Sequence, residues 1–231
     1  MKNENYQINL KKDDLYYKIM IIGSDYVGKT QILKRFCREG FEENYYPTFG
    51  MDFRVQKYFY ENLTTTIQII EVSGKNFPPK ELLKAYILDA DCFICVYDVT
   101  KRDSVNELNN IISDYERLIG NGNKSQCWYF VGNKNDKLDR ECSNNPADIF
   151  GYTPLGTIGF IEVSAKENKF IENMFNNAIF QIKNIKRRNI ENNENNNNGD
   201  SNYIPPKIND IDNNTKKIPI KEESKKKCNI F

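Results

Sequence analysis

The chain has 231 residues, of which 39% are hydrophobic, enough for one buried core spanning about 170 to 190 residues. Its 33 basic and 32 acidic residues give a net charge of +1, so no overall field favours nucleic acid and we expect no nucleic-acid partner. Histidine is absent, which excludes imidazole metal ligands, a catalytic triad with a histidine base and a histidine pH switch.

Apolar runs and helical patterns alternate along the chain. Strands are predicted at residues 16–22, 51–59, 66–72, 91–97, 127–132 and 158–163. Helices are predicted at residues 29–39, 79–88, 103–119 and 167–187, with a short one at 146–151. This alternation predicts an α/β fold, a mainly parallel sheet covered by helices on both faces, with ligands at the carboxyl ends of its strands.

The predicted domain, residues 15–188, lies between two polar ends. Residues 1–14 form an N-terminal extension that does not resemble a signal peptide, and no run approaches the roughly 20 apolar residues of a membrane span. Residues 189–231 begin with an asparagine-rich run that has nothing to bury, so we expect no order from Asn189 onward. One stripe of the last predicted helix is expected to face the core and consists of Phe170, Met174, Phe175, Ala178, Ile179 and Ile182.

Five of the six cysteines lie in apolar or mixed surroundings without paired spacing of the zinc-site type, which favours a reducing compartment. Cys92 and Cys95 have CxxC spacing, but they lie within an apolar run. We therefore expect buried strand thiols there, and a redox or metal pair is the alternative.

A glycine-rich loop, Gly-Ser-Asp-Tyr-Val-Gly-Lys-Thr, joins the first predicted strand to the first predicted helix and has the pattern GxxxxGKT. In this context backbone N–H groups point at a polyphosphate, and the helix adds the positive end of its dipole. Lys29 would reach the β- and γ-phosphates, and the Thr30 hydroxyl would ligate Mg²⁺. An ordinary glycine-containing turn is the alternative. The loop residues predicted to bind nucleotide are Gly23, Asp25, Tyr26, Val27, Gly28, Lys29 and Thr30.

A base-recognition motif, Asn133-Lys134-Asn135-Asp136, follows the fifth predicted strand. The Asp136 carboxylate can accept two parallel hydrogen bonds from the N1–H and exocyclic amine of guanine, a donor pair that adenine lacks. Asn133 can bond the purine N7 and tie this loop to the phosphate loop, while the Lys134 stem can lie along the base.

The segment Ser164-Ala165-Lys166, after the last predicted strand, complements this motif. A backbone N–H near Ala165 could donate to the guanine O6 atom. Ordinary polar loops remain the alternative for both segments.

Together these motifs resemble those of the Ras superfamily of small GTPases, and most of all those of its Rab branch. The resemblance covers about residues 15–188 and rests on residues 23–30, 47–53, 74, 97–100, 133–136 and 164–166. It implies a P-loop NTPase fold with a six-stranded sheet and about five helices, and it implies GTP or GDP with Mg²⁺ as cofactors.

The resemblance also assigns residues of the first switch. Thr48 would reach Mg²⁺ and the γ-phosphate when GTP is bound and would release them after hydrolysis. Phe41 matches an aromatic residue that packs against guanine, and Tyr45 matches one that can cover the γ-phosphate. Either could instead be a surface aromatic residue of the loop.

The second switch departs from the family's WDTAGQE pattern. Glu71 replaces the aspartate that holds Mg²⁺, usually through water, so we expect a looser or re-angled metal shell. Lys75 replaces the glutamine that orients the attacking water, and an ammonium group is only a donor. Asp25 would stand near the γ-phosphate and near the place where an activating arginine inserts. We therefore expect GTP binding with slow hydrolysis, in which the catalytic residues are Lys29, Thr48, Gly74 and Lys75 and the metal-binding residues are Thr30, Thr48 and Glu71.

The last seven residues, Lys-Lys-Lys-Cys-Asn-Ile-Phe, form a CaaX-like box that predicts prenylation of Cys228. The final phenylalanine favours geranylgeranyl over farnesyl, although Asn229 is not aliphatic. Residues 207–228 carry seven Lys and four Asp or Glu, a net charge of +3 that favours an anionic membrane. A solvated basic tail with an incidental cysteine is the alternative.

We therefore expect a monomeric Rab-like switch in vesicle traffic, at the cytoplasmic face of intracellular membranes and cycling with the cytosol. The resemblance implies effector proteins, an exchange factor, a GTPase-activating protein and a prenyltransferase as partners. The main alternative is a non-hydrolysing GTP-binding scaffold. A P-loop kinase of small molecules is a third reading, and the guanine motifs oppose it.

Overall fold

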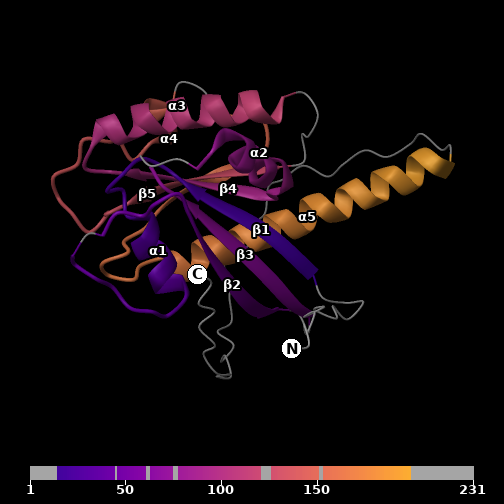
Figure 1. Ribbon diagram of the computed structural model, residues 1–231, viewed down its shortest axis with the longest axis horizontal. Helices are drawn as coiled ribbons and strands as arrows, with labels where there is room; N and C mark the ends of the chain where they lie inside the picture. The colour runs from indigo at the N-terminus through magenta and orange to yellow at the C-terminus, as the bar shows by residue number, and fades with distance from the viewer. Residues whose placement is uncertain are drawn as a thin grey trace, which may run out of the picture.

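Figure 1 shows the computed structural model of the chain, in which one twisted sheet is flanked by helices. The structure describes residues 15–44, 46–60, 63–74, 78–120, 126–150 and 153–198, and it describes only the backbone of residues 15, 58–60, 63 and 190–198. The predictions for Tyr45, Lys75 and Cys228 therefore lie outside the described residues.

The sheet has six strands in the order β2-β3-β1-β4-β5-β6. Only β2 and β3 pair in antiparallel fashion within the described strands, and all other neighbouring pairs are parallel. The elements in chain order are β1 (Leu15–Ile22), α1 (Lys29–Phe36), β2 (Met51–Tyr60), β3 (Leu63–Val72), α2 (Lys80–Asp89), β4 (Cys92–Asp98), α3 (Arg102–Ile119), β5 (Cys127–Asn133), α4 (Pro146–Ile149), β6 (Thr157–Glu162) and α5 (Ile171–Asn198). The predicted α/β fold with a mainly parallel sheet is confirmed.

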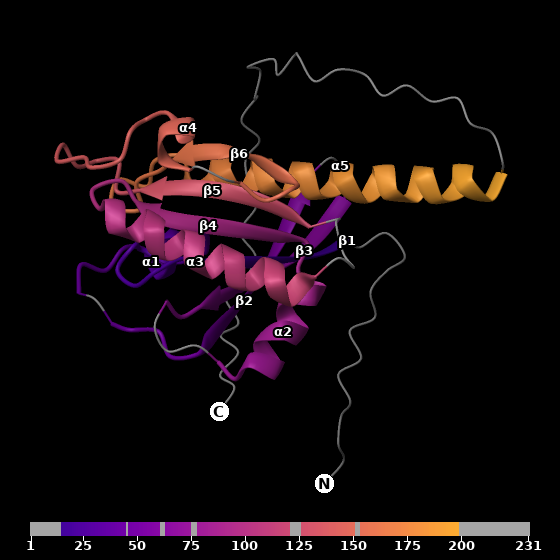
Figure 2. The same ribbon diagram turned by 90° about the horizontal axis from the view of Figure 1, so that it is seen from above.

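Helices cover both faces of the sheet, and β1 contributes to both layers of the core. Ile19 and Ile21 pack with α1 and α5 on one face, whereas Met20 and Ile22 pack with α2 and α3 on the other. Figure 2 shows this arrangement from above, with α3 on one side of the sheet and α5 on the other. A strand buried on both faces needs a continuous apolar run, which is why β1 lacks the alternation of a half-exposed strand.

The thiols of Cys92 and Cys95 are fully buried within β4. Burial raises the pKa of both thiols well above the ordinary value, so neither offers the thiolate that metal or redox chemistry requires. Among the described residues, no cluster of three or more Cys, Asp or Glu is arranged to hold a metal. The prediction of buried strand thiols is confirmed.

The last helix differs from the prediction at both ends. Helix α5 continues to Asn198, although the sequence predicts no order from Asn189 onward. A helix that core contacts have nucleated gains one backbone hydrogen bond for each added residue, so it can continue without further apolar burial. Phe170 leaves the predicted stripe because it precedes α5 in a left-handed turn (φ +60°) and is 47% exposed. No helix of the described chain is both long and apolar enough to cross a membrane.

Candidate nucleotide-binding site

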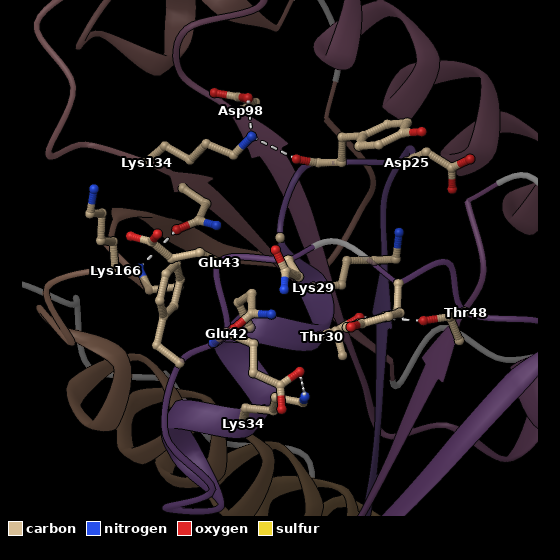
Figure 3. A pocket seen from close by; sticks show the side chains of 18 of the residues that line it. Asp25, Lys29, Thr30, Lys34, Glu42, Glu43, Thr48, Asp98, Lys134 and Lys166 are labelled. Carbon is tan, nitrogen blue, oxygen red and sulfur yellow. Dashed lines mark hydrogen bonds and ion pairs between the residues drawn. The ribbon is translucent and has the colours of Figure 1, made fainter.

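A cavity of about 510 Å³ opens at the carboxyl end of the sheet, where the segments that follow β1, β3, β4, β5 and β6 meet (Figure 3). This is the edge at which parallel α/β sheets bind ligands, and the volume falls within the usual range of small-molecule sites. The predicted site residues that line it are Asp25, Tyr26, Gly28, Lys29, Thr30, Phe41, Thr48, Glu71, Gly74, Asn133, Lys134, Asp136, Ala165 and Lys166. Three further predicted residues, Gly23, Val27 and Ser164, are buried behind this surface.

Two glycines of the loop after β1 are required by close backbone packing. At Gly23 (φ +148°) a Cβ would lie 2.2 Å from the carbonyl oxygen of Val96, and at Gly28 (φ +94°) it would lie 2.4 Å from Asn133 Nδ2. No side chain fits at such distances, and both φ values favour glycine. The loop is thereby held against β4 and the guanine-motif loop, with its own backbone along the cavity.

Lys29 is the first residue of α1, and its side chain contacts the loop that precedes the helix. Its side chain is almost fully buried, and Nζ donates hydrogen bonds to the carbonyl oxygens of Gly23 and Ser24, both at 2.8 Å. Burial lowers the pKa of Lys29, although the charges of Glu71 and Asp25 oppose this shift. An ammonium group held in this way is a preorganised donor for a phosphate oxygen.

The three predicted metal-binding residues meet at one point, although they come from α1, the first switch and β3. Thr30 Oγ1 donates to Glu71 Oε1 at 2.5 Å, and Thr48 Oγ1 donates to the same oxygen at 3.2 Å. The two hydroxyl oxygens are 3.3 Å apart, and Figure 3 shows Thr30 and Thr48 facing one another. Burial raises the pKa of Glu71, while the Thr30 hydrogen bond and the Lys29 charge act against this. The group has the oxygen donors that Mg²⁺ prefers.

Gly74 and Asp25 are in close contact where the second switch begins. A Cβ on Gly74 would lie 2.5 Å from the backbone nitrogen of Asp25 and 2.7 Å from its Oδ1. Only glycine fits there, so the Asp25 carboxylate and the Gly74 backbone share one corner of the cavity.

The guanine motif is tied to the phosphate loop by two hydrogen bonds. Asn133 Nδ2 donates to the Val27 carbonyl oxygen at 2.8 Å, which is the predicted link between the two loops. Lys134, at φ +69°, donates from Nζ to the Tyr26 carbonyl oxygen at 2.6 Å. These contacts fix the position of the motif relative to the phosphate loop.

The Ser164-Ala165-Lys166 segment orients the guanine motif from the other side. Ser164 Oγ donates to Asp136 Oδ1 at 2.6 Å, which fixes the orientation of the carboxylate. The Ala165 N–H donates to Asn133 Oδ1 at 3.1 Å. The N–H that the sequence predicts as a donor to guanine O6 thus already has an acceptor, because the Asn133 amide bridges the loops after β1, β5 and β6.

Two positioning residues received no role from the sequence, although Asp98 lies within the segment 97–100 that carries the family resemblance. Asp98, the last residue of β4, is buried and pairs with Lys134 Nζ at 2.6 Å (Figure 3). A carboxylate that ends a fully apolar strand is a signal that could have identified it. Arg35 donates to the carbonyl oxygens of Ala165 at 2.7 Å and Lys166 at 2.6 Å, and its guanidinium lies 5.3 Å from the centre of the Phe41 ring. Its acceptors are backbone atoms about 130 residues away, so no local pattern marks it.

The residues present fit a guanine nucleotide with a divalent cation. Lys29 and the loop backbone suit phosphates, the trio of Thr30, Thr48 and Glu71 suits Mg²⁺, and the Asp136 carboxylate suits the guanine donor pair. Moreover, Glu71 Oε2 is buried and has no hydrogen-bond partner among the described residues, as expected for an oxygen that a cation would neutralise.

Comparisons with known proteins agree with this geometry. The chain is 29% identical over 170 residues to Ras-related protein RABD1 of Arabidopsis thaliana, covering 74% of this chain and 80% of the relative. It is 30% identical over 170 residues to GTP-binding protein ypt1 of Schizosaccharomyces pombe, covering 74% and 81%. It is 34% identical over 161 residues to GTP-binding protein drn-1 of Caenorhabditis elegans, covering 69% and 72%.

The match to a protein family extends over almost the whole described domain. Residues 18–184 match the Ras family, from within β1 into α5, so all six strands of the sheet are included. The similarity to RABD1 and ypt1 makes the chain a distant relative of Rab-type members. The chain therefore belongs to the Ras family of small GTPases.

Proposed function

We propose that the protein is a Rab-like guanine-nucleotide switch that binds GDP and GTP with Mg²⁺, hydrolyses GTP slowly and acts on membranes in vesicle traffic. The nucleotide assignment rests on the residues that lie at the two ends of one cavity. Lys29 lies among phosphate-loop carbonyl groups at one end, and Asp136, held at 2.6 Å by Ser164, lies at the other. The membership in the Ras family and the similarity to Rab-type relatives support the same reading.

The chemistry would be in-line attack of water on the γ-phosphate, producing GDP and phosphate. The Lys29 ammonium and the Gly74 N–H would stabilise negative charge on the transferring group, and Thr48 would orient it. A bound Mg²⁺ would neutralise charge on the phosphate oxygens. By its position in the family's sequence pattern, Lys75 replaces a glutamine whose amide would accept a hydrogen bond from the attacking water, and an ammonium group lacks that acceptor.

The close contact of Asp25 with Gly74 adds a second reason for slow hydrolysis. The Asp25 carboxylate occupies the corner beside the Gly74 backbone. A negative side chain there repels the developing phosphoryl charge and leaves less room for an arginine supplied by an activating protein. The other proposed partners are an exchange factor, effector proteins and a prenyltransferase.

Attachment to membranes is proposed from the tail sequence. A prenyl group on Cys228 would supply the apolar anchor, and the surrounding lysines would add attraction to anionic lipid. A single lipid chain binds only weakly, so both signals would be needed for stable attachment.

A non-hydrolysing, GTP-binding scaffold is the second candidate, and it is favoured by the pair of departures in the second switch. Lys75 and Glu71 both alter groups that serve the hydrolytic step, whereas the base-recognition contacts at Asp136 serve binding alone. Nucleotide content after purification and a single-turnover rate would separate the two candidates.

Calorimetric titration of the nucleotide-free protein with GDP and ADP tests the nucleotide assignment. We expect GDP to bind at least about 100-fold more tightly than ADP, since two charge-assisted hydrogen bonds to Asp136 are lost with adenine. Asp136→Asn should weaken GDP binding similarly and favour xanthosine diphosphate, because an amide can pair with one donor and one acceptor.

Asp139→Asn is the matched control for this titration. Asp139 is exposed, lies in the same loop and does not line the cavity, so the same change of charge should leave GDP binding unaltered. Equal affinity for GDP and ADP, or no binding of either, would refute the proposed function.

A further inference from the structure

Three side-chain oxygens at the base of the cavity form a small triangle. The edges are 2.5 Å from Thr30 Oγ1 to Glu71 Oε1, 3.2 Å from Thr48 Oγ1 to Glu71 Oε1, and 3.3 Å between the two hydroxyl oxygens. Octahedral Mg²⁺ binds oxygen at about 2.0 to 2.1 Å, so neighbouring ligands are roughly 2.9 Å apart. The three edges bracket this value. The triangle therefore has the size of one face of an octahedral cation shell.

The extra methylene of glutamate places the third oxygen in this triangle. An aspartate at position 71 would end about 1.5 Å short of it, by the length of one C–C bond. A water molecule fills a gap of that kind, so the carboxylate contacts the cation through the water and not directly. Glu71 leaves no such gap, because its Oε1 accepts hydrogen bonds from both threonines.

Neighbouring cations balance the charge of Glu71 only in part. The residue is 1% exposed, and Oε2 has no hydrogen-bond partner among the described residues. Arg54 Nη1 is 3.9 Å from Oε2, but this arginine is engaged by Asp52 at 2.6 Å and by Glu39 at 3.5 Å. Lys29 donates to two loop carbonyl groups instead. A buried carboxylate in this setting calls for a cation close by.

We propose that Glu71 binds the divalent cation directly, as a third protein oxygen beside Thr30 and Thr48. This inference rests on the proposed guanine-nucleotide site and deepens it. A charged ligand supplied by the protein strengthens cation binding when only a diphosphate is present. Thr48, which shares Glu71 Oε1, is then retained at the cation without the γ-phosphate, so the first switch responds less to hydrolysis than a water-mediated site allows.

Electron paramagnetic resonance of Mn²⁺ bound to the protein with GDP tests this proposal. Line broadening by ¹⁷O-labelled water reports how many water molecules the ion binds. We expect Glu71→Asp to bind more water than the wild type, because water fills the gap left by the shorter side chain. Glu71→Gln should weaken Mn²⁺ binding about 10-fold or more, since it removes the ligand charge.

Glu107→Asp is the matched control, because it makes the same change at an exposed residue of α3 that does not line the cavity. It should leave the water number unchanged. The same water number in wild type and Glu71→Asp would overturn the proposal. Calorimetric titration of GDP in buffer containing Mg²⁺ tests the nucleotide site separately. A protein that binds no GDP in this titration would refute the proposed function. The Glu71 contact would still be tested with Mn²⁺ bound to the nucleotide-free protein, because Glu71→Asp should again increase the number of water molecules on the ion.

Discussion

Asp98, to which the sequence assigned no role, helps to hold the loop after β5 in place. The carboxylate is 1% exposed, accepts hydrogen bonds from the Thr100 backbone and hydroxyl at 3.0 and 2.7 Å, and pairs with Lys134. Burial alone would raise the pKa of Asp98, but the hydrogen bonds from Lys134 and Thr100 outweigh burial and hold it below the ordinary value. The ionised form is therefore part of the folded structure.

Substitution of Asp98 should make stability less dependent on pH. A carboxyl group whose pKa is depressed by folding stabilises the protein above its unfolded pKa, about 3.9, and this contribution is lost as the pH falls through the folded pKa. We expect Asp98→Asn to reduce the free energy of unfolding by about 1.5 to 3 kcal/mol at pH 7. The difference from wild type should shrink below about pH 4 in urea titrations. A difference that stays constant with pH would contradict this prediction.

Another prediction for a single residue concerns Lys75 and the rate of GTP hydrolysis. We expect Lys75→Gln to raise the single-turnover rate of GTP hydrolysis, because a carboxamide accepts a hydrogen bond from water and donates to the phosphoryl group, whereas an ammonium only donates. The rate is measured with purified protein loaded with GTP, and Lys80→Gln provides a control with the same change of charge at the exposed start of α2. An unchanged or lower rate for Lys75→Gln would remove Lys75 as the cause of slow hydrolysis.

At the scale of elements, helix α1 connects the two ends of the cavity. Its first residue, Lys29, lies within the phosphate loop, and Arg35 near its end holds two carbonyl groups of the segment after β6. The Arg35 guanidinium also lies over Phe41, which lines the cavity and packs against the core. The residues proposed to contact the phosphates and the base are thus connected by one helix.

Loss of Arg35 should loosen the base end of the site. We expect Arg35→Gln to accelerate GDP dissociation about 10-fold, since roughly 1.4 kcal/mol corresponds to that factor and two charge-assisted hydrogen bonds are weakened. Release of a fluorescent GDP analogue measures the rate. Arg38→Gln makes an equal charge change at an exposed residue just beyond α1. GDP should dissociate from this variant at the wild-type rate. Identical rates for both variants would show that Arg35 does not position the base loop.

At the scale of the whole molecule, charge is distributed unevenly along a chain that is nearly neutral overall. The net charge is +1, yet residues 207–228 alone carry +3. A basic segment beside an apolar anchor binds anionic membranes more strongly than either feature alone.

Removal of the proposed lipid site should release the full chain from membranes. We expect Cys228→Ser to shift a tagged protein from the membrane fraction to the supernatant, because the lysines alone supply too little attraction at physiological salt. Cell fractionation measures the shift. Cys37→Ser, a half-exposed cysteine in the domain, is the control that should stay with the membranes. Membrane binding that survives Cys228→Ser would contradict the proposed anchor.

The order of apolar runs determined the architecture before any tertiary contact was known. The alternation of apolar strand patterns with helical patterns predicts a parallel sheet between helices, and the continuous apolar segments at β1 and β4 are in fact buried on both faces. The spacing of Gly23 and Gly28 likewise predicts the backbone conformation of the loop, because glycine readily adopts the positive φ angles found there. The extent of α5 was not predictable in this way, since a helix can extend beyond its core contacts on its own hydrogen bonds.

The sequence by itself thus determined the fold class, the glycine-rich loop and the proposed base-reading carboxylate, because each depends on a short pattern. Only the tertiary structure decided which residues far apart in the sequence contact one another. It placed Ala165 N–H on Asn133, Arg35 on the segment after β6, and Glu71 between two threonines from different elements. Such contacts arise when the loops at one edge of the sheet are packed together, and no pattern local to any of these residues encodes them.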